Sequence, residues 1–128
     1  MDKQTRNLII VLVLCAATAG PWARQLERGD VAEVKTIEVV ASTFQFDPAT
    51  ISVTQGDTIR LRLHSADRTH ALAIKGFGVR AMIPRGGETV TVEFVANQAG
   101  TFEFICAEYC GSGHGGMKGK LVVLPREK

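Results

Sequence analysis

The stretch TIRLRLH, residues 58–64, carries the pattern that decides the fold class. Its aliphatic residues occupy every second position, and arginine or histidine stands between them. Successive side chains of a β-strand point to opposite faces, so this alternation predicts a strand with one buried face and one solvated face. His64 falls on the solvated face, where we expect a histidine in water rather than a ligand.

Short runs rich in β-branched and aromatic residues follow one another from residue 36 onward, and turn residues separate them. The runs besides 58–63 are TIEVVA (36–41), TFQF (43–46), ISVT (51–54), HALAI (70–74), VRAMI (79–83), ETVTVEFVA (88–96), TFEFICA (101–107) and KLVVL (120–124). About eight strands in roughly ninety residues, with frequent turns, predict an all-β Greek-key sandwich. Met82, within VRAMI, is expected in its core.

The N-terminal residues 1–23 combine two basic side chains, Lys3 and Arg6, with the apolar run LIIVLVLCAATAG (8–20). We expect a short apolar helix here, either a cleaved signal peptide or a membrane anchor. Its length of roughly 18 Å falls short of a hydrocarbon core near 30 Å, so the two readings stay open. Residues 24–35 are expected to be a linker and 36–128 a single domain on the extracytoplasmic, periplasmic side, anchored or secreted.

The charge pattern argues against nucleic-acid binding. The chain has 128 residues and 45% hydrophobic residues, with 15 lysines and arginines against 13 acidic residues. These charges are scattered rather than clustered, so no basic footprint for a phosphate backbone appears. From residue 36 onward the two signs nearly balance, and no acidic patch for a basic partner protein is evident.

The segment CAEYCGSGHGGM, residues 106–117, gathers two thiols, an imidazole and a thioether among four glycines. Glycine tolerates positive φ and close backbone approach, so we expect a loop that turns these side chains into one volume. Such soft ligands favour copper over zinc, because a thioether suits copper(I). A further ligand has to come from elsewhere, and His70, which opens a strand after a turn, is the candidate.

This cluster has four other readings. Exported thiols commonly form disulfides, so Cys106 and Cys110 could be bonded. Two cysteines and two histidines could hold structural zinc. A mononuclear blue-copper site would use one cysteine, two histidines and a methionine, which leaves Cys106 without a role. A catalytic Cys–His pair is the fourth reading.

The motif C-x-E-x-C-G-x-G-H-x-x-M at 106–117, with D-x-x-H at 67–70, closely resembles the binuclear copper A domain of cytochrome c oxidase subunit II. The stretches TFQFDPATISVTQGD and IPRGGETVTVEF resemble the same family, and together the resemblance covers about residues 36–125. It implies a cupredoxin sandwich.

The resemblance also implies the ligands. Two copper ions would be bridged by the thiolates of Cys106 and Cys110 and capped by His70 and His114, with Met117 and the Glu108 carbonyl as weak ligands. Asp67, Phe44 and Tyr109 would lie in the surroundings of the centre or near the point where electrons arrive.

Such a centre passes electrons and transforms no substrate by itself. In the family, the electron comes from cytochrome c or another small donor and leaves for a heme in the large subunit of a terminal oxidase. The alternative is a free-standing periplasmic cupredoxin that delivers copper or assists oxidase assembly.

Overall fold

A computed structural model describes residues 32–128 of the chain. The predicted N-terminal helix, and most of the predicted linker, lie outside the described residues. Within 32–128, no helix has both the length and the apolar character needed to cross a bilayer.

The first sheet has four strands in the order β2-β1-β4-β7. Their bounds are β1 Val34–Ser42, β2 Gln45–Asp47, β4 Thr58–Ser65 and β7 Val90–Val95. Strands β1 and β4 run parallel, with Val34 opposite Thr58 at one end of the ladder and Ala41 opposite Ser65 at the other. The register therefore pairs each of residues 34–41 with the residue 24 positions later.

The second sheet has five strands in the order β3-β9-β8-β5-β6. Their bounds are β3 Thr50–Thr54, β5 His70–Ile74, β6 Val79–Ile83, β8 Gly100–Cys106 and β9 Lys118–Leu124. Two short 3-10 helices, η2 (Lys75–Phe77) and η3 (His114–Gly116), lie in connections. Strands β8 and β5 are antiparallel neighbours, which brings the end of β8 next to the start of β5.

The core lies between the two sheets. The inward aliphatic positions of β4 are fully buried, and they pack with buried side chains from β1, β5, β8 and β9. Phe46 of the first sheet meets Phe104 of the second edge to face, with ring centroids 5.4 Å apart. The all-β sandwich predicted from strand alternation is therefore confirmed. His64 lies on β4 and is half-buried.

One local prediction was wrong. Met82, expected in the core, is 46% exposed, because alternation along the edge strand β6 turns its neighbours Ala81 and Ile83 inward instead. The first strand begins at Val34, two residues before the expected start of the domain, because the parallel ladder with β4 extends to that residue.

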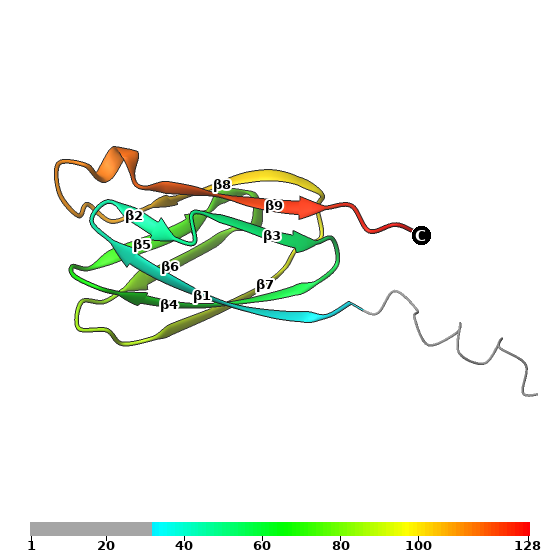
Figure 1. The fold of residues 1–128 in the computed structure, drawn as a ribbon, viewed down its shortest axis with the longest axis horizontal. Coiled ribbons are helices and arrows are strands. Elements are labelled where there is room, and N and C mark those ends of the chain that lie inside the picture. Colours follow the sequence, from blue (N-terminus) through cyan, green and yellow to red (C-terminus); the bar gives the residue numbers. More distant parts are fainter. Residues whose placement is uncertain (1–31) are drawn as a thin grey trace, which may run out of the picture. The chain divides into compact units, whose positions relative to one another are not determined.

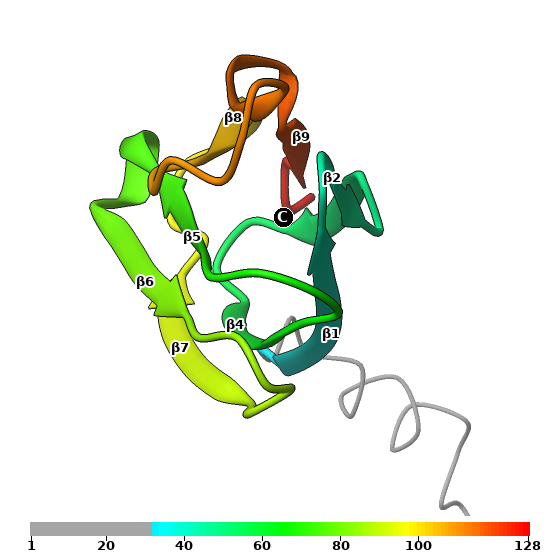
Figure 2. The ribbon, with the colours of Figure 1, turned by 90° about the vertical axis from the view of Figure 1, so that its left-hand side faces the viewer.

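One end of the sandwich collects the loops that matter for the site. Figure 1 shows the β1–β2, β4–β5, β6–β7 and β8–β9 connections at the same end, with the C-terminus at the opposite end. Figure 2 looks onto that loop end, where the β8–β9 connection lies beside the ends of β5, β8 and β9. The predicted ligands come from two of these connections.

Candidate metal centre

The β8–β9 connection is held as a closed loop by its own two ends. Cys106 is the last residue of β8, and Met117 stands directly before β9. The backbone N–H of Cys106 donates to the carbonyl of Met117 at 3.0 Å, which continues the antiparallel ladder to the loop's base. Both residues are therefore fixed by the rigid sheet.

Glycine at position 113 allows the loop to lie against the ring of Phe44. A Cβ added to Gly113 would come within 2.2 Å of that ring, and Gly111 has φ +135°. Larger residues would push the loop away from the β1–β2 turn. These two positions explain why the loop needs glycine, one for close approach to Phe44 and one for its positive φ.

The two thiols face each other in the interior. Cys106 and Cys110 are 3% and 4% exposed, and their Sγ atoms are 3.7 Å apart. A disulfide requires about 2.05 Å, and both residues are free cysteines. The structure thus brings the thiols together without bonding them.

Each thiol has one histidine beside it. Nδ1 of His70 lies 3.9 Å from the Cys106 sulfur, and Nδ1 of His114 lies 3.7 Å from the Cys110 sulfur. His70 is fully buried at the start of β5, and its ring nitrogen and both sulfurs fall within 4.8 Å of one another. His70, Cys106 and Cys110 therefore form a possible metal site.

Each thiol also has one weaker donor beside it. The Glu108 carbonyl oxygen lies 3.1 Å from the Cys106 sulfur, and Sδ of the buried Met117 lies 3.7 Å from the Cys110 sulfur. The donors are thus arranged as two similar sets, each with one sulfur, one imidazole nitrogen and one weak donor. All six predicted ligand residues gather in one place.

Asp67 orients His70 from the far side of the imidazole. Its Oδ1 is 2.7 Å from His70 Nε2, and its Oδ2 accepts from the backbone N–H and the hydroxyl of Thr43 at 2.7 and 2.6 Å. Burial opposes ionisation of this carboxyl, but the hydrogen bonds from Thr43 and His70 outweigh it and hold its pKa well below the usual range. A carboxylate accepts, so Nε2 carries a proton, and the neutral imidazole that a metal ion binds would offer its Nδ1 lone pair on the side of the thiols.

Burial has the opposite effect on the thiol of Cys110. It raises the pKa of Cys110 to about 11, and the neighbouring Cys106 adds to the increase. Metal coordination requires the thiolate. Burial disfavours the thiolate form of Cys110, so a bound cation would have to stabilise it.

The other predicted neighbours take different positions. Phe44 packs on the ligand loop, as described for Gly113, whereas Tyr109 is 74% exposed with its ring centroid 5.7 Å from that of His114. Tyr109 is therefore available at the surface and Phe44 is a packing residue.

Sequence reasoning missed two residues of the surroundings. Thr43 lies 24 residues before Asp67 and carried no motif, so only the strand register could reveal it. Arg68 stands inside the D-x-x-H motif, and its Nη1 donates to the Cys110 carbonyl at 3.0 Å. Its basic side chain beside a ligand motif was the available signal.

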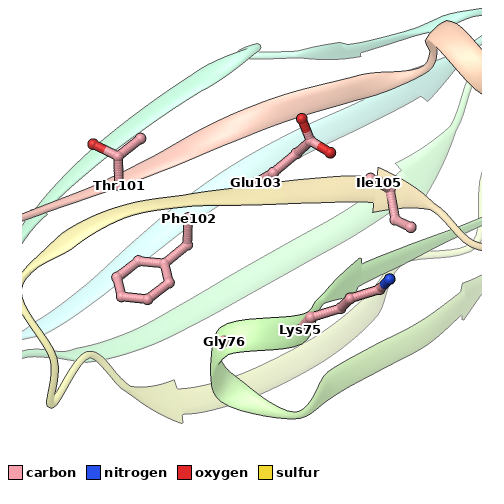
Figure 3. Close-up of a pocket in the computed structure, with 6 residues that line it drawn as sticks. All are labelled: Lys75, Gly76, Thr101, Phe102, Glu103 and Ile105. Atoms are coloured by element: carbon pink, nitrogen blue, oxygen red, sulfur yellow. The ribbon is translucent and has the colours of Figure 1, made fainter.

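A separate pocket on the second sheet, with a volume of about 300 Å³, holds none of these residues. Figure 3 shows its lining of Lys75, Gly76, Thr101, Phe102, Glu103 and Ile105. No cysteine or histidine lines it, so it adds nothing to the metal chemistry.

Comparison with known proteins agrees with this arrangement. The cupredoxin-like domain family matches residues 7–123. A cytochrome c oxidase subunit 2 of Thermus thermophilus is 34% identical over 107 residues, which are 81% of this chain and 78% of that protein. The chain is a cupredoxin-like member of the cytochrome c oxidase subunit II family. A second subunit 2 from the same species has the same identity, and this chain spans 62% of its length.

A solved structure shows the same fold. The periplasmic domain of subunit II of cytochrome oxidase from Bradyrhizobium japonicum superposes with a TM-score of 0.65 at 22% identity, over 71% of this chain and 84% of that one. The predicted resemblance to subunit II is confirmed by the family match. Family membership supports copper as the metal that the clustered thiols and histidine bind.

Proposed function

We propose that this chain is the electron-transfer domain of a terminal oxidase, with a binuclear copper A centre on the extracytoplasmic side of the membrane. The observation that carries the proposal is the doubled donor set. Cys106 has His70 and the Glu108 carbonyl beside it, and Cys110 has His114 and Met117. A mononuclear site would need only one such set.

The donor separations fit bound metal. Typical bonds from a first-row ion are about 2.0 Å to nitrogen and about 2.3 Å to sulfur. The separations of 3.9 and 3.7 Å between each sulfur and its nearest Nδ1 are below the sum of these lengths, so one ion can reach both atoms. The two thiolates are close enough to be shared by two ions.

When bound, a copper pair held by the two thiolates would supply a one-electron redox couple. The chain's own contribution is positioning. Asp67 fixes the His70 tautomer, β8 and β9 fix the ends of the ligand loop, and the buried thiols exclude water. A rigid frame changes little on gain or loss of an electron, which is what rapid transfer requires.

Partners and location follow from the same proposal. The Bradyrhizobium relative is described as a periplasmic domain of an oxidase subunit, and a terminal oxidase complex and a periplasmic location fit this chain too. We propose a small electron donor such as cytochrome c and a heme-bearing large subunit as acceptor. Attachment to the membrane through the N-terminal segment is also part of this proposal.

The test is to load the purified full chain with copper, count copper per chain and record its electron paramagnetic resonance spectrum. We expect two coppers and a hyperfine pattern shared by two nuclei. Cys110→Ser should abolish the shared pattern while circular dichroism still reports the sandwich. Met117→Leu is the matched control, because loss of a weak donor should leave both coppers bound. One copper with a single-nucleus pattern would disprove the binuclear centre, and ready surrender of copper to an acceptor protein would favour copper delivery.

A further inference from the structure

A solvent-facing pocket of about 380 Å³ lies directly beside the ligand loop. Its lining consists of Arg68, Thr69, Arg85, Tyr109, Cys110 and Gly111. It is formed where the β4–β5, β6–β7 and β8–β9 connections meet, and the backbone N–H of Arg85 donates to the Thr69 hydroxyl at 3.3 Å. The pocket therefore combines two guanidinium groups with an exposed aromatic ring at the metal end of the sandwich.

Among residues 32–128, no acidic side chain neutralises the two arginines of this pocket. Arg60 and Arg62 on β4 form ion pairs with glutamates on neighbouring strands, at 2.5 and 2.6 Å. Within residues 32–128, by contrast, no acidic side chain forms an ion pair with Arg68 or Arg85, and both side chains are exposed. The nearby Asp67 carboxylate already forms hydrogen bonds with Thr43, with His70 and with the backbone N–H of Arg68.

One of these guanidinium groups connects the pocket to the centre. Arg68 donates through Nη1 to the carbonyl of Cys110, and the thiol of the same residue is one of the two central sulfurs. Arginine has five N–H donors, so the remaining ones can bind a carboxylate in the paired geometry that this group favours. A carboxylate held there would be linked to Cys110 through a single arginine.

We propose that this pocket docks an acidic surface side chain of the protein that donates electrons to the centre. The inference rests on the proposed function. Exposed Tyr109 adds apolar contact area of the kind that protein interfaces use, which a small anion would leave uncovered. The partner is therefore an acidic protein donor, such as a c-type cytochrome with a negative surface around its heme edge.

The electron balance of the docked step is simple. The donor's ferrous heme loses one electron and becomes ferric, and the copper centre gains that electron. The carboxylate and the guanidinium keep their charges, and no bond forms or breaks. Attraction between opposite charges speeds the encounter at low ionic strength and is screened by salt.

The experiment measures stopped-flow reduction of the copper-loaded full chain by an acidic and by a basic ferrous c-type cytochrome, at low and at high salt. We expect the acidic cytochrome to react faster at low salt and to slow as salt rises. The double variant Arg68→Gln/Arg85→Gln should lose about three- to tenfold in that low-salt rate, because charges at an interface act mainly on association. Arg68→Lys keeps the charge but not the paired geometry, so its rate should lie between those of the unmodified chain and the double variant. Lys128→Gln, at the opposite end of the sandwich, should change the rate less than about twofold.

The controls separate this inference from the proposed function. A spectrum shared by two copper nuclei in every variant shows that the centre is intact, whereas its absence in the unmodified chain overturns the proposed function itself. With an intact centre, an acidic-cytochrome rate that is unaffected by the double variant, or that rises with salt, overturns the docking site. Hexacyanoferrate(II) serves as a small-anion probe. If the double variant slows this probe but not the acidic cytochrome, the pocket binds small anions only and the proposal is wrong.

Discussion

Two aspartates stand at opposite ends of the same β1–β4 ladder, and their different partners distinguish the two ends of the molecule. Asp57 accepts from the backbone N–H of Glu33 at 3.1 Å, and Asp67 accepts from the backbone N–H of Thr43 at 2.7 Å. Each pair continues the 24-residue offset of the ladder beyond its last rung. At both ends of the ladder, therefore, an aspartate accepts a hydrogen bond from the backbone of the residue 24 positions earlier.

The remaining bonds of the carboxylates differ. Asp57 is 1% exposed and pairs with the Arg126 guanidinium at 2.5 Å, and Arg126 also donates to the Gln55 carbonyl. This ties the C-terminal tail to the start of β4. Asp67 instead binds the imidazole of His70, which leaves Nδ1 facing two thiols. One end is closed by an internal ion pair, whereas the other gathers donors that could hold a metal ion.

The strongest test of this contrast exchanges each carboxylate for an amide. Asp57→Asn should lower the free energy of unfolding by about 2–3 kcal/mol, because it breaks a buried ion pair whose arginine keeps some solvent contact. The copper spectrum should not change. Urea unfolding and electron paramagnetic resonance measure the two quantities.

The matched variant Asp67→Asn should lose less stability and should change the properties of the copper centre. We expect about 1 kcal/mol of lost stability, since its side chain is 36% exposed, together with a more positive reduction potential of the copper-loaded protein. Removal of a negative charge beside His70 disfavours the more positive, oxidised state. If both variants changed stability alone, the two ends would have the same role and the contrast would be wrong.

Lowering the pH should weaken the stabilisation that Asp57 provides at its end of the molecule. Burial opposes ionisation of Asp57, but the Glu33 hydrogen bond and the Arg126 charge outweigh it and lower its pKa in the folded protein. The unfolded pKa is about 3.9, so the stabilisation is complete well above that pH and is lost as pH falls toward the folded pKa. The stability gap between the unmodified chain and Asp57→Asn should shrink as pH is lowered from about 7 to about 3. A gap that is constant in urea titrations across this range would contradict the assignment.

Thr43→Val, at the metal end, is expected to change stability alone. This change removes the hydroxyl donor to Asp67 but keeps the backbone N–H bond, so we expect about 1 kcal/mol of lost stability by urea unfolding. Thr50→Val, on an exposed strand position, is the control and should cost less than about 0.5 kcal/mol. Equal effects of the two variants would show that the Thr43 hydroxyl does not support Asp67.

The sequence predicted the frame and the ligand loop because both are local patterns. Alternation in residues 58–64 reports which side chains are buried, and this needs no knowledge of the partner strands. The spacing from Cys106 to Met117 likewise places four soft donors on one short, glycine-rich connection. Local alternation was less reliable at the edge strand β6, where the structure leaves Met82 outside the core.

The tertiary structure alone decided which distant residues complete each end. Thr43 meets Asp67, Glu33 meets Asp57 and Arg126 reaches Asp57 because strand register brings together residues that are far apart in the chain. The pocket of Arg68, Arg85 and Tyr109 arises in the same way, from three connections that meet at one end. Sequence spacing determines which side chains a segment brings close together, whereas the pairing of the strands determines which distant side chains surround them.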